Sequence, residues 1–537
     1  MHRSRAVGRE RDECSSAASD TVGRHDRSSV ASENQGTWIM KVDNVTATIA
    51  NNAKRRPRHP ALIEGDVIVT FEELELRLSH MAGWLRAQGI EAEMIAALSM
   101  RDGIDHIVAM LAILRLGAIL LPVDARWTDA EKKRVIEYFA ASAFVADQPN
   151  SIYEKTIVVD DLWMDSSGIA ASDFVTTWST NANSPLLLSL SSGTTGVPKG
   201  PLLKHGPYIE RLFYEMVSAE RTQRDVNMLA TPLYFGGGRN VTLQNLFFGA
   251  TVVLLPPPYE VERLVEEVNR RSVTSLFLVP TILRRLLKLP AQDGLLIPSV
   301  KMLMCSGAML HAEEAQSIRE RVTPNLLNTY ATTDGGIATV LAPEDAVERP
   351  GSVGRPAYLV DVEVVDDNHR SLPPRSVGYL RYKPPGLADG FYNNSEQSEL
   401  SFRDGWFYPG DLGYLDEDGY LYIVGRSKDM IIRGGVNIYP EEVESILASH
   451  DAVRDVAVLG WPIGTMGEEV AAIVVLDSEM EETALIDFCR LELASYKVPR
   501  RLFFVEQLPR NESGKINKKG LAKCLPDDLD GSLKPFV

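Results

Sequence analysis

Strand-like and helix-like segments alternate between residues 250 and 330, and this alternation constrains the fold more than any other feature of the chain. The apolar runs expected to be strands are 251–255, 275–280, 300–307 and 325–330, and the expected helices lie at 261–271 and 282–288. Strands separated by helices favour a parallel sheet with covering helices. The sequence therefore predicts an α/β fold.

An amphipathic helix is expected earlier in the chain, over residues 70–89. Apolar side chains from Leu74 to Leu85 repeat at the three- and four-residue spacing of one helix face. Thr70, followed three residues later by Glu73, fits a capping box at its start.

The pattern changes after residue 350 to short antiparallel strands. The run from Gly413 to Gly425 predicts a hairpin with its turn at Asp418-Gly419. A compact α+β unit is then expected from strand-like runs at 453–460, 470–476 and 501–506 and a helix at 482–494. The segment 425–429 is the expected joint between the two bodies.

The N-terminal segment, residues 1–39, is rich in Arg, Ser and acidic residues and almost free of apolar ones. Such a segment cannot bury enough surface to offset its ordering entropy, so we expect disorder. Its acidic residues argue against a transit peptide, and no secretory apolar region is present. Translation from Met40 rather than Met1 stays open.

Composition excludes some partners. The net charge of −17 argues against a nucleic-acid partner. The four cysteines show no metal-ligand spacing, which indicates inert thiols in a reducing, cytoplasmic compartment. The apolar stretch from His106 is interrupted by Arg115 and Gly117, so it predicts a buried helix and strand rather than a transmembrane segment.

A loop rich in glycine and hydroxyls, "SSGTTGVPKG", occupies residues 191–200. Backbone N–H groups in a glycine-rich turn can converge on phosphate oxygens, because no Cβ blocks the approach. Lys199 adds a positive charge, so the loop predicts a polyphosphate ligand. The spacing differs from the Walker pattern. Taken alone, the loop is also compatible with a flexible surface segment.

The chain contains four further motifs, one before the loop and three after it: "LRLGAILLPVD", "NTYATTDGG", "FYPGDLGYLDEDGYLYIVGRSKDMIIRGGVNIYPEEVE" and "PRNESGKINKKGL". Together with the loop, they make the chain resemble the adenylate-forming superfamily of acyl-CoA synthetases, peptide-synthetase adenylation domains and luciferases. The resemblance runs from about residue 44 to about residue 525, and the acyl-CoA synthetases are the most similar branch.

The resemblance implies a large ATP- and acyl-binding domain at 40–425, with mainly parallel sheets covered by helices and a small β-barrel-like part. A hinge at 426–429, containing Lys428, would join it to a small, mobile α+β domain at 430–537 that carries the catalytic lysine.

The resemblance also implies roles for single residues toward ATP. The loop residues that would bind its phosphates are Ser191, Ser192, Gly193, Thr194, Thr195 and Gly196, with Lys199. Tyr330, Gly307 and Ala308 would contact adenine, and Asp411 with Arg426 would hold the ribose.

The remaining roles concern catalysis. Thr333 would donate to the α-phosphate, and Lys515 would bridge the substrate carboxylate and the α-phosphate as the catalytic lysine. Asp334 would hold Mg²⁺, although the family usually has a glutamate there, and Ala331 replaces a usual glycine. Aspartate keeps the hard oxygen ligand but is one methylene shorter.

The expected reaction has two halves. Transfer of a carboxylate to the α-phosphorus of ATP releases pyrophosphate and gives an acyl-adenylate, which needs positioning and charge stabilisation rather than a protein nucleophile. Rotation about the hinge would then bring in Gly434 and Gly435 beside the thiol of coenzyme A.

The acyl group is expected beside Phe235, Gly236 and Gly237. Glycine at 236 disfavours an α-amino acid, because amino-acid-activating relatives carry an aspartate there. The missing side-chain volume suits an aryl, alicyclic or medium-chain acyl group, and a simple tight turn is the equal alternative. Arg239 is expected to face solvent or to form an ion pair, rather than to meet a second substrate carboxylate.

Other functions stay open at this point. The acceptor thiol is that of coenzyme A in our preferred interpretation and that of a carrier protein in the alternative. A luciferase-type monooxygenase, a nucleotide-binding homologue with impaired catalysis and a scaffold protein are the further options. A homodimer is one open possibility for the assembly.

Overall fold

The computed structural model describes residues 42–149, 153, 156–160, 163, 170–190, 199–290, 293–433, 436–462, 468–510, 515–526 and 531–534. The predictions for residues 1–39 and for Met40 lie outside these residues. Within them, every helix is too short or too polar to cross a membrane.

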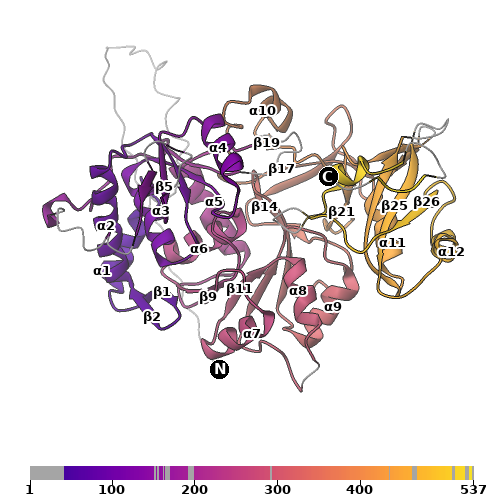
Figure 1. Ribbon diagram of the computed structural model, residues 1–537, viewed down its shortest axis with the longest axis horizontal. Helices are drawn as coiled ribbons and strands as arrows, with labels where there is room; N and C mark the ends of the chain where they lie inside the picture. The colour runs from indigo at the N-terminus through magenta and orange to yellow at the C-terminus, as the bar shows by residue number, and fades with distance from the viewer. Residues whose placement is uncertain are drawn as a thin grey trace, which may run out of the picture. The chain divides into compact units, whose positions relative to one another are not determined.

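Two mainly parallel sheets form the large domain (Figure 1). The nine-stranded sheet is ordered β15 (Arg355–Pro356), β14 (Gly336–Leu341), β13 (Leu326–Thr332), β12 (Met302–Cys305), β11 (Ser275–Leu278), β9 (Val226–Leu229), β10 (Thr251–Leu254), β1 (Pro60–Glu64) and β2 (Val67–Thr70). The six-stranded sheet is ordered β6 (Thr156–Val158), β5 (Ala143–Ala146), β3 (Ile95–Ser99), β4 (Ile119–Pro122), β7 (Pro185–Leu188) and β8 (Leu202–Lys204).

One apolar core fills the space between the two sheets and contains side chains from both of them. The helices in this layer are α2 (Phe71–Ala87), α3 (Ile104–Leu116), α5 (His205–Ser218) and α6 (Gly236–Phe248), with α1 (Ala47–Arg55) packed on α2 and α6. The predicted capping box of Thr70 and Glu73 starts α2. The stretch from His106 forms the buried helix α3 and the strand β4, as predicted.

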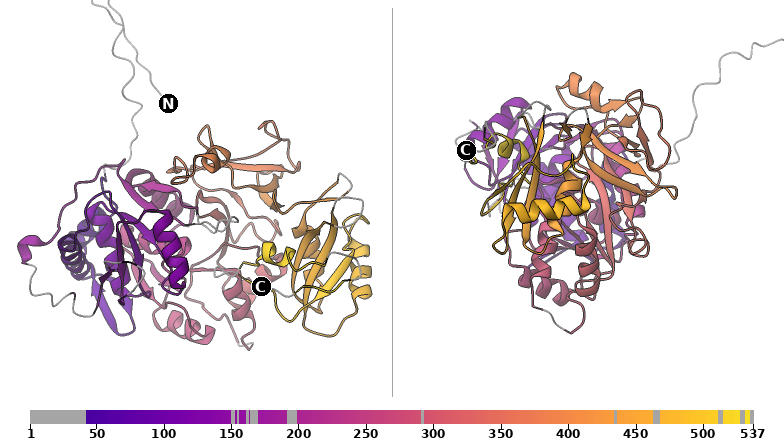
Figure 2. Two further views of the ribbon diagram at one scale, coloured as in Figure 1. Left: turned by 45° about the horizontal axis from the view of Figure 1, so that its top comes forward. Right: turned by 90° about the vertical axis from the view of Figure 1, so that its right-hand side faces the viewer.

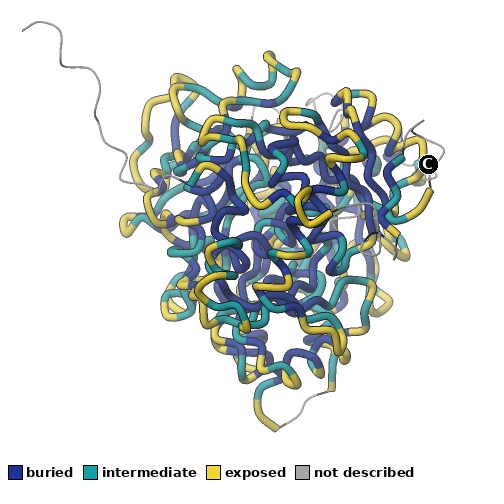
Figure 3. Tube along the Cα trace, turned by 90° about the vertical axis from the view of Figure 1, so that its left-hand side faces the viewer, coloured by how far each residue is buried: buried dark blue, intermediate teal, exposed yellow. Residues whose placement is uncertain are grey.

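The outer face of each sheet is covered by further helices, and the successive layers give the predicted α/β fold. The nine-stranded sheet is covered by α7 (Val261–Arg270), α8 (Pro280–Leu287) and α9 (Ala312–Arg321), and the six-stranded sheet by α4 (Asp129–Tyr138). Figure 3 shows that the buried chain lies in the interior, whereas exposed chain is found mainly in outer loops.

The expected β-barrel-like part is an antiparallel sheet. Its order is β18 (Phe402–Arg403), β19 (Trp406–Phe407), β17 (Gly378–Lys383), β20 (Asp411–Leu415) and β21 (Leu421–Arg426), with β16 (Asp361–Val365) beside β17 and helix α10 (Ser395–Ser401) before β18. Strand pairs among the described residues do not close it into a barrel. The predicted hairpin is β20–β21, and its turn contains Asp418-Gly419.

The C-terminal unit contains a sheet of β24 (Val453–Trp461), β25 (Glu469–Leu476) and β26 (Arg501–Phe504), with a β-ribbon of β22 (Ile431–Arg433) and β23 (Val436–Ile438) before it (Figure 2). Val456 and Val458 pack under α11 (Pro440–Ala448) and α12 (Glu482–Glu492). Ala457 and Leu459 face the opposite core with α13 (Lys518–Ala522). This alternation is the period of two expected for a sheet covered on both faces.

The apolar cores separate at one point of the chain. Each hydrophobic cluster among the described residues uses either residues up to Ile423 or residues from Ile431 onward. The segment between them contains the residues 426–429 predicted as a hinge.

Candidate functional site

The candidate site lies at the carboxyl edge of four neighbouring strands. Strands β9, β11, β12 and β13 are parallel and adjacent. The segments that follow them, 230–235, 279, 306–308 and 333–334, therefore emerge at the same edge of the sheet, where open α/β sheets bind ligands. A large cleft at this edge is lined by residues from all four segments and by residues of the small domain.

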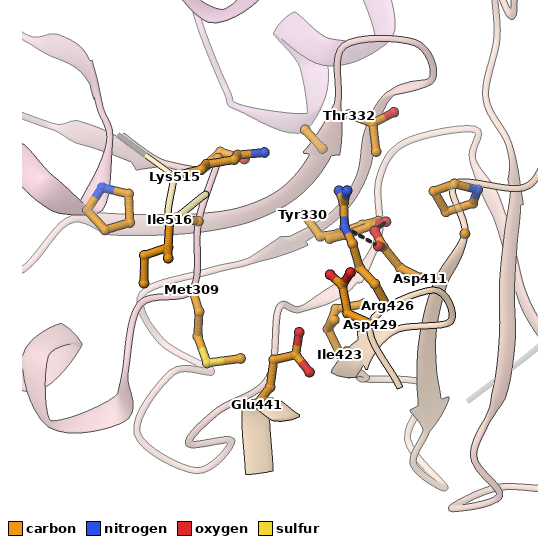
Figure 4. A pocket seen from close by; sticks show the side chains of 18 of the residues that line it. Met309, Tyr330, Thr332, Asp411, Ile423, Arg426, Asp429, Glu441, Lys515 and Ile516 are labelled. Atoms are coloured by element: carbon orange, nitrogen blue, oxygen red, sulfur yellow. Dashed lines mark hydrogen bonds and ion pairs between the residues drawn. The ribbon is translucent and has the colours of Figure 1, made fainter. Parts of the chain in front are cut away.

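Tyr330, Asp411 and Arg426 converge in this cleft from three different strands (Figure 4). The Tyr330 hydroxyl donates to Oδ2 of Asp411, and Nε of Arg426 lies 3.1 Å from Oδ1. Asp411 and Arg426 are direct cross-strand partners in the β20–β21 hairpin, which explains their pairing. Asp411 is 5% exposed, and each of its oxygens keeps lone pairs for further donors.

The loop after β12 contains Gly307 and Ala308, which were predicted to contact adenine. Gly307 has φ +97°, in the left-handed region that favours glycine, and a Cβ there would contact only Val279 within 4 Å. Ser306 fixes the start of the loop, since its hydroxyl donates to the carbonyl of Thr329 at 2.8 Å. Both predicted residues line the cleft.

Thr333 and Asp334 follow β13 directly, and α5 holds their backbone in place. The Arg211 guanidinium on α5 donates to the carbonyl of Asp334 at 3.0 Å. Burial lowers the pKa of Lys199, and the Asp334 carboxylate opposes this effect. Nζ of Lys199 donates to Oε1 of Gln397 at 2.5 Å.

Lys515 reaches the cleft from the small domain. Figure 4 shows its side chain pointing into the pocket toward the side on which Tyr330, Asp411 and Arg426 lie. The surrounding protein lowers the pKa of Lys515 and Arg426 lowers it further, whereas Asp411 raises it. The structure therefore brings this lysine and the Asp411 carboxylate, 104 residues apart, to one site.

Contacts within the small domain anchor the chain on both sides of Lys515. Before it, Arg510 forms a β-bridge with Ile516. After it, the Asn517 side chain caps α13 by accepting from the N–H of Gly520, and Nζ of Lys518 lies 2.7 Å from Oε1 of Glu444 on α11.

Some predicted residues lie outside the described residues. They are Ser191, Ser192, Gly193, Thr194, Thr195 and Gly196 of the phosphate loop, and Gly434 and Gly435 of the proposed thiol tunnel.

The acyl side of the cleft begins with Phe235, Gly236 and Gly237, which all line it. The alternative of a simple tight turn is wrong, because Gly236 to Gly238 form the first turn of α6. A Cβ at Gly236 would lie 3.5 Å from Cγ2 of Thr333, in ordinary contact, so Gly236 lies beside the residue predicted for the α-phosphate.

Arg239 differs from the prediction. It is 1% exposed, and its guanidinium donates to the carbonyl of Tyr234 at 2.8 Å and to Oγ of Ser189 at 2.9 Å. Its hydrogen-bond partners among the described residues are backbone carbonyls and a hydroxyl rather than a carboxylate. Burial lowers its pKa to about 10. Arg239 therefore fixes the segment before α6 instead of facing solvent.

Sequence reasoning missed several cleft residues because they lie on helices and a strand outside the sequence motifs. These are Glu215 on α5, Asn240 and Gln244 on α6, Phe277 on β11 and Gln397 on α10. A signal existed for Glu215, since it is a charged residue that shares the core-facing side of an amphipathic helix with Tyr208 and Leu212.

The donors for a magnesium ion are few. The described residues contain no group of three or more His, Cys, Asp or Glu side chains that could hold a metal ion. Asp334 lines the cleft directly after Thr333 and offers one carboxylate for the ion. This fits Mg²⁺, which usually keeps several waters and binds through one or two carboxylates plus substrate phosphates.

Comparisons with known proteins identify the family. The family model "AMP-binding enzyme" matches residues 49–392, and "AMP-binding enzyme C-terminal domain" matches residues 442–515. The chain is 30% identical over 490 residues to 2-succinylbenzoate–CoA ligase of Listeria monocytogenes, which covers 89% of this chain and 99% of the relative.

Two solved structures are similar over nearly the whole chain. O-succinylbenzoate CoA synthetase (MenE) from Bacillus subtilis, in complex with the acyl-adenylate OSB-AMP, has a TM-score of 0.84 at 28% identity and covers 91% of this chain and 100% of its own. The B. subtilis synthetase with ATP and a magnesium ion has a TM-score of 0.81 at 29% identity, with coverages of 88% and 98%.

The comparisons confirm the fold and the reaction predicted from the sequence. The reaction converts a carboxylic acid and ATP, with magnesium, into an acyl-adenylate and pyrophosphate, and then transfers the acyl group to coenzyme A. By its family models and its relatives, the chain belongs to the AMP-binding enzymes, as an AMP-forming acid–thiol ligase.

Proposed function

We propose that the chain converts an aryl carboxylic acid into its coenzyme A thioester. The observation that carries this proposal is the apolar wall next to Thr333, formed by Phe235, Val241 and Phe277 together with Met304 and Ile337. Flat aromatic rings bury much apolar area and pack well against such walls. The 2-succinylbenzoate named for the relatives is also an aryl acid.

In the first half-reaction, the main problem is the approach of two anions. The Lys515 ammonium would lie between the substrate carboxylate and the α-phosphate, and the Thr333 hydroxyl would donate to the α-phosphate. Magnesium, held by Asp334 and the phosphates, would supply positive charge at the departing pyrophosphate. Lys199 would hold the β- and γ-phosphates. Fixed charges in a cleft that excludes water stabilise such a transition state strongly.

The nucleotide would be held mainly by its ribose and its base. Asp411, with both oxygens already oriented by Tyr330 and Arg426, would accept from the ribose hydroxyls. The aromatic ring of Tyr330 and the open backbone of Gly307 and Ala308 would contact the adenine.

The second half-reaction requires Lys515 to leave. Rotation about Lys428, an exposed residue between the two sets of apolar cores, would withdraw it together with the small domain. Gly434 and Gly435 would then approach the pantetheine chain.

The acceptor, the compartment and the oligomeric state need separate support. Coenzyme A is our acceptor, with a carrier-protein thiol as the alternative. The three described cysteines, Cys305, Cys489 and Cys524, are buried thiols outside any disulfide among the described residues, which is compatible with the proposed cytoplasmic location.

ATP–pyrophosphate exchange with a panel of aryl, alicyclic and fatty acids, followed by thioester formation with and without coenzyme A, tests the function. We expect exchange with aryl acids and coenzyme A-dependent thioester. Exchange without any thioester would favour a carrier protein as acceptor. ATP binding without exchange for any acid would contradict the proposal and favour a homologue with impaired catalysis.

A further inference from the structure

The acyl side of the cleft follows one face of α6. Gly236, Asn240 and Gln244 lie four residues apart on this helix, and all three line the cleft. Four-residue steps keep side chains on one helix face, and eight residues rise about 12 Å. Because Gly236 lies beside Thr333, the Gln244 end lies about 12 Å along the helix from the proposed position of the reacting carboxylate.

A carboxylate occupies this distal end. Glu215 on α5 lines the cleft and is 4% exposed. Nε2 of Gln244 donates to its Oε2, and the N–H of Ile337 donates to its Oε1 at 3.4 Å. Both partners are donors, so Glu215 is an acceptor here. A carboxylate has about four lone-pair sites, so Glu215 keeps acceptor capacity for a ligand.

Two buried arginines lie near Glu215 but do not reach the cleft. Arg211 donates to the carbonyls of Asp334 and Gly386, at 3.0 and 3.4 Å. Nη2 of Arg221 lies 3.9 Å from Sδ of Met304, which itself lines the cleft. Neither arginine belongs to the described residues that line it. A substrate in this pocket would therefore meet a carboxylate and not a guanidinium.

We propose that this pocket selects aryl acids with a hydrogen-bond donor, such as a hydroxyl or amino group, at the end distal to the reacting carboxylate. This inference rests on the proposed function above. A second carboxylate at that end would face Glu215 where little water screens the repulsion. An unsubstituted ring would leave acceptor sites of a buried carboxylate without a partner, which is costly. The selectivity would thus differ from that of the relatives named for 2-succinylbenzoate, an acid with two carboxyl groups.

The test uses the full-length wild-type chain and 3-phenylpropenoic acids that differ only at the para position. Hydrogen, hydroxyl, amino and carboxyl substituents are compared by kcat/KM in ATP–pyrophosphate exchange. We expect kcat/KM for the para-hydroxyl and para-amino substrates to exceed that for the unsubstituted acid by roughly 10- to 100-fold. A site built to accept from a donor rejects analogues that lack the donor. The kcat/KM for the carboxyl-substituted acid should be lower than that for the unsubstituted acid.

Glu215→Gln provides the second measurement. This substitution keeps the shape of the side chain and removes its charge. The ratio of kcat/KM for the carboxyl-substituted acid to kcat/KM for the unsubstituted acid should therefore rise at least about tenfold. Glu210→Gln is the matched control, because Glu210 lies on the same helix but not among the described cleft-lining residues. Glu210→Gln should leave the ratios of kcat/KM among the four acids unchanged.

The outcomes separate the inference from the function it rests on. A wild-type preference for the unsubstituted or the carboxyl-substituted acid would overturn the inference while leaving the ligase function intact. Absence of exchange with every acid, including the unsubstituted one, would overturn the proposed function and the inference together. The comparison of the four acids with the wild-type protein tests the inference even if Glu215→Gln does not fold.

Discussion

At the scale of the residue, two glycines at the start of α6 have different reasons to be glycine. A Cβ at Gly238 would lie 2.3 Å from the carbonyl oxygen of Pro232, which real Cβ atoms do not approach. A Cβ at Gly236 would make ordinary contact with Thr333. Gly238 is therefore needed for packing, whereas Gly236 leaves space in the acyl pocket.

Gly238→Ala should destabilise the protein by about 1–3 kcal/mol, because the backbone must move to accept the methyl group. Thermal unfolding measures this effect. Gly236→Ala is the matched variant: its melting temperature should stay near that of the wild type, while KM for the acid rises. Equal loss of stability in both variants would contradict this assignment.

Asp411→Ala should raise KM for ATP by roughly 10- to 100-fold, because a buried acceptor for the ribose hydroxyls is lost. Steady-state kinetics at saturating acid measure this change. Asp418→Ala is the control, since Asp418 lies in the exposed turn of the same hairpin. An unchanged KM in Asp411→Ala would remove this carboxylate from the ribose site.

At the scale of the element, helix α11 of the small domain packs against β21. The Glu441 carboxyl lies over Gly425, where a Cβ would come within 2.2 Å of Oε2. Gly425 has φ +149°, so glycine is favoured there for its backbone as well. Burial raises the pKa of Glu441 to about 7, although Lys518 lowers it.

An acid whose folded pKa lies above its unfolded value destabilises the fold when it ionises. The α11–β21 contact should therefore weaken as pH rises from about 4.5 to about 7 and stay weak above that. Glu441→Gln should stabilise the protein at pH 8, by at most about 3 kcal/mol, and have little effect at pH 5. Thermal unfolding at both values measures the difference.

Glu442→Gln is the control, because Glu442 is the neighbouring residue and pairs with Lys497 at 2.5 Å. Glu442→Gln should not increase the stability of the protein at pH 8. An equal effect of Glu441→Gln at both pH values would contradict the burial of an ionisable carboxyl at this contact.

Most elements could be predicted from the sequence because local patterns determine them. The strands around the cleft are apolar runs between helices, and the capping box of Thr70 marks the start of α2. The start of α6 was not predictable in this way, since three consecutive glycines have low helix propensity. The close approach of Phe277 to Gly237 and of the Pro232 carbonyl to Gly238 explains why glycines occupy this turn of the helix.

At the scale of the whole molecule, the residues proposed for the nucleotide could be selected from the sequence, whereas those at the distal end of the cleft could not. Tyr330, Asp411 and Lys515 belong to sequence motifs, and the structure brings all three to one cleft. Glu215 and Gln244 lie on separate helices, and only their packing brings them together. Arg239 was misjudged for the same reason, since its partners are backbone and side-chain oxygens from other segments.

The proposed rotation between the domains gives a prediction at this scale. Lys428→Pro restricts the backbone of the hinge, so ATP–pyrophosphate exchange should stay within about threefold of wild type while thioester formation falls by roughly 10²-fold. Lys428→Ala is the control, because it removes the side chain but leaves the backbone free. Loss of both half-reactions in the proline variant alone would contradict a hinge at this residue.

The central claim is that Lys515 acts in the first half-reaction alone. The measurement compares Lys515→Ala in ATP–pyrophosphate exchange and in thioester formation from a supplied acyl-adenylate. We expect exchange to fall by roughly 10²- to 10³-fold, with thioester formation nearly unchanged. Equal loss in both reactions, or full exchange in the variant, would contradict the account.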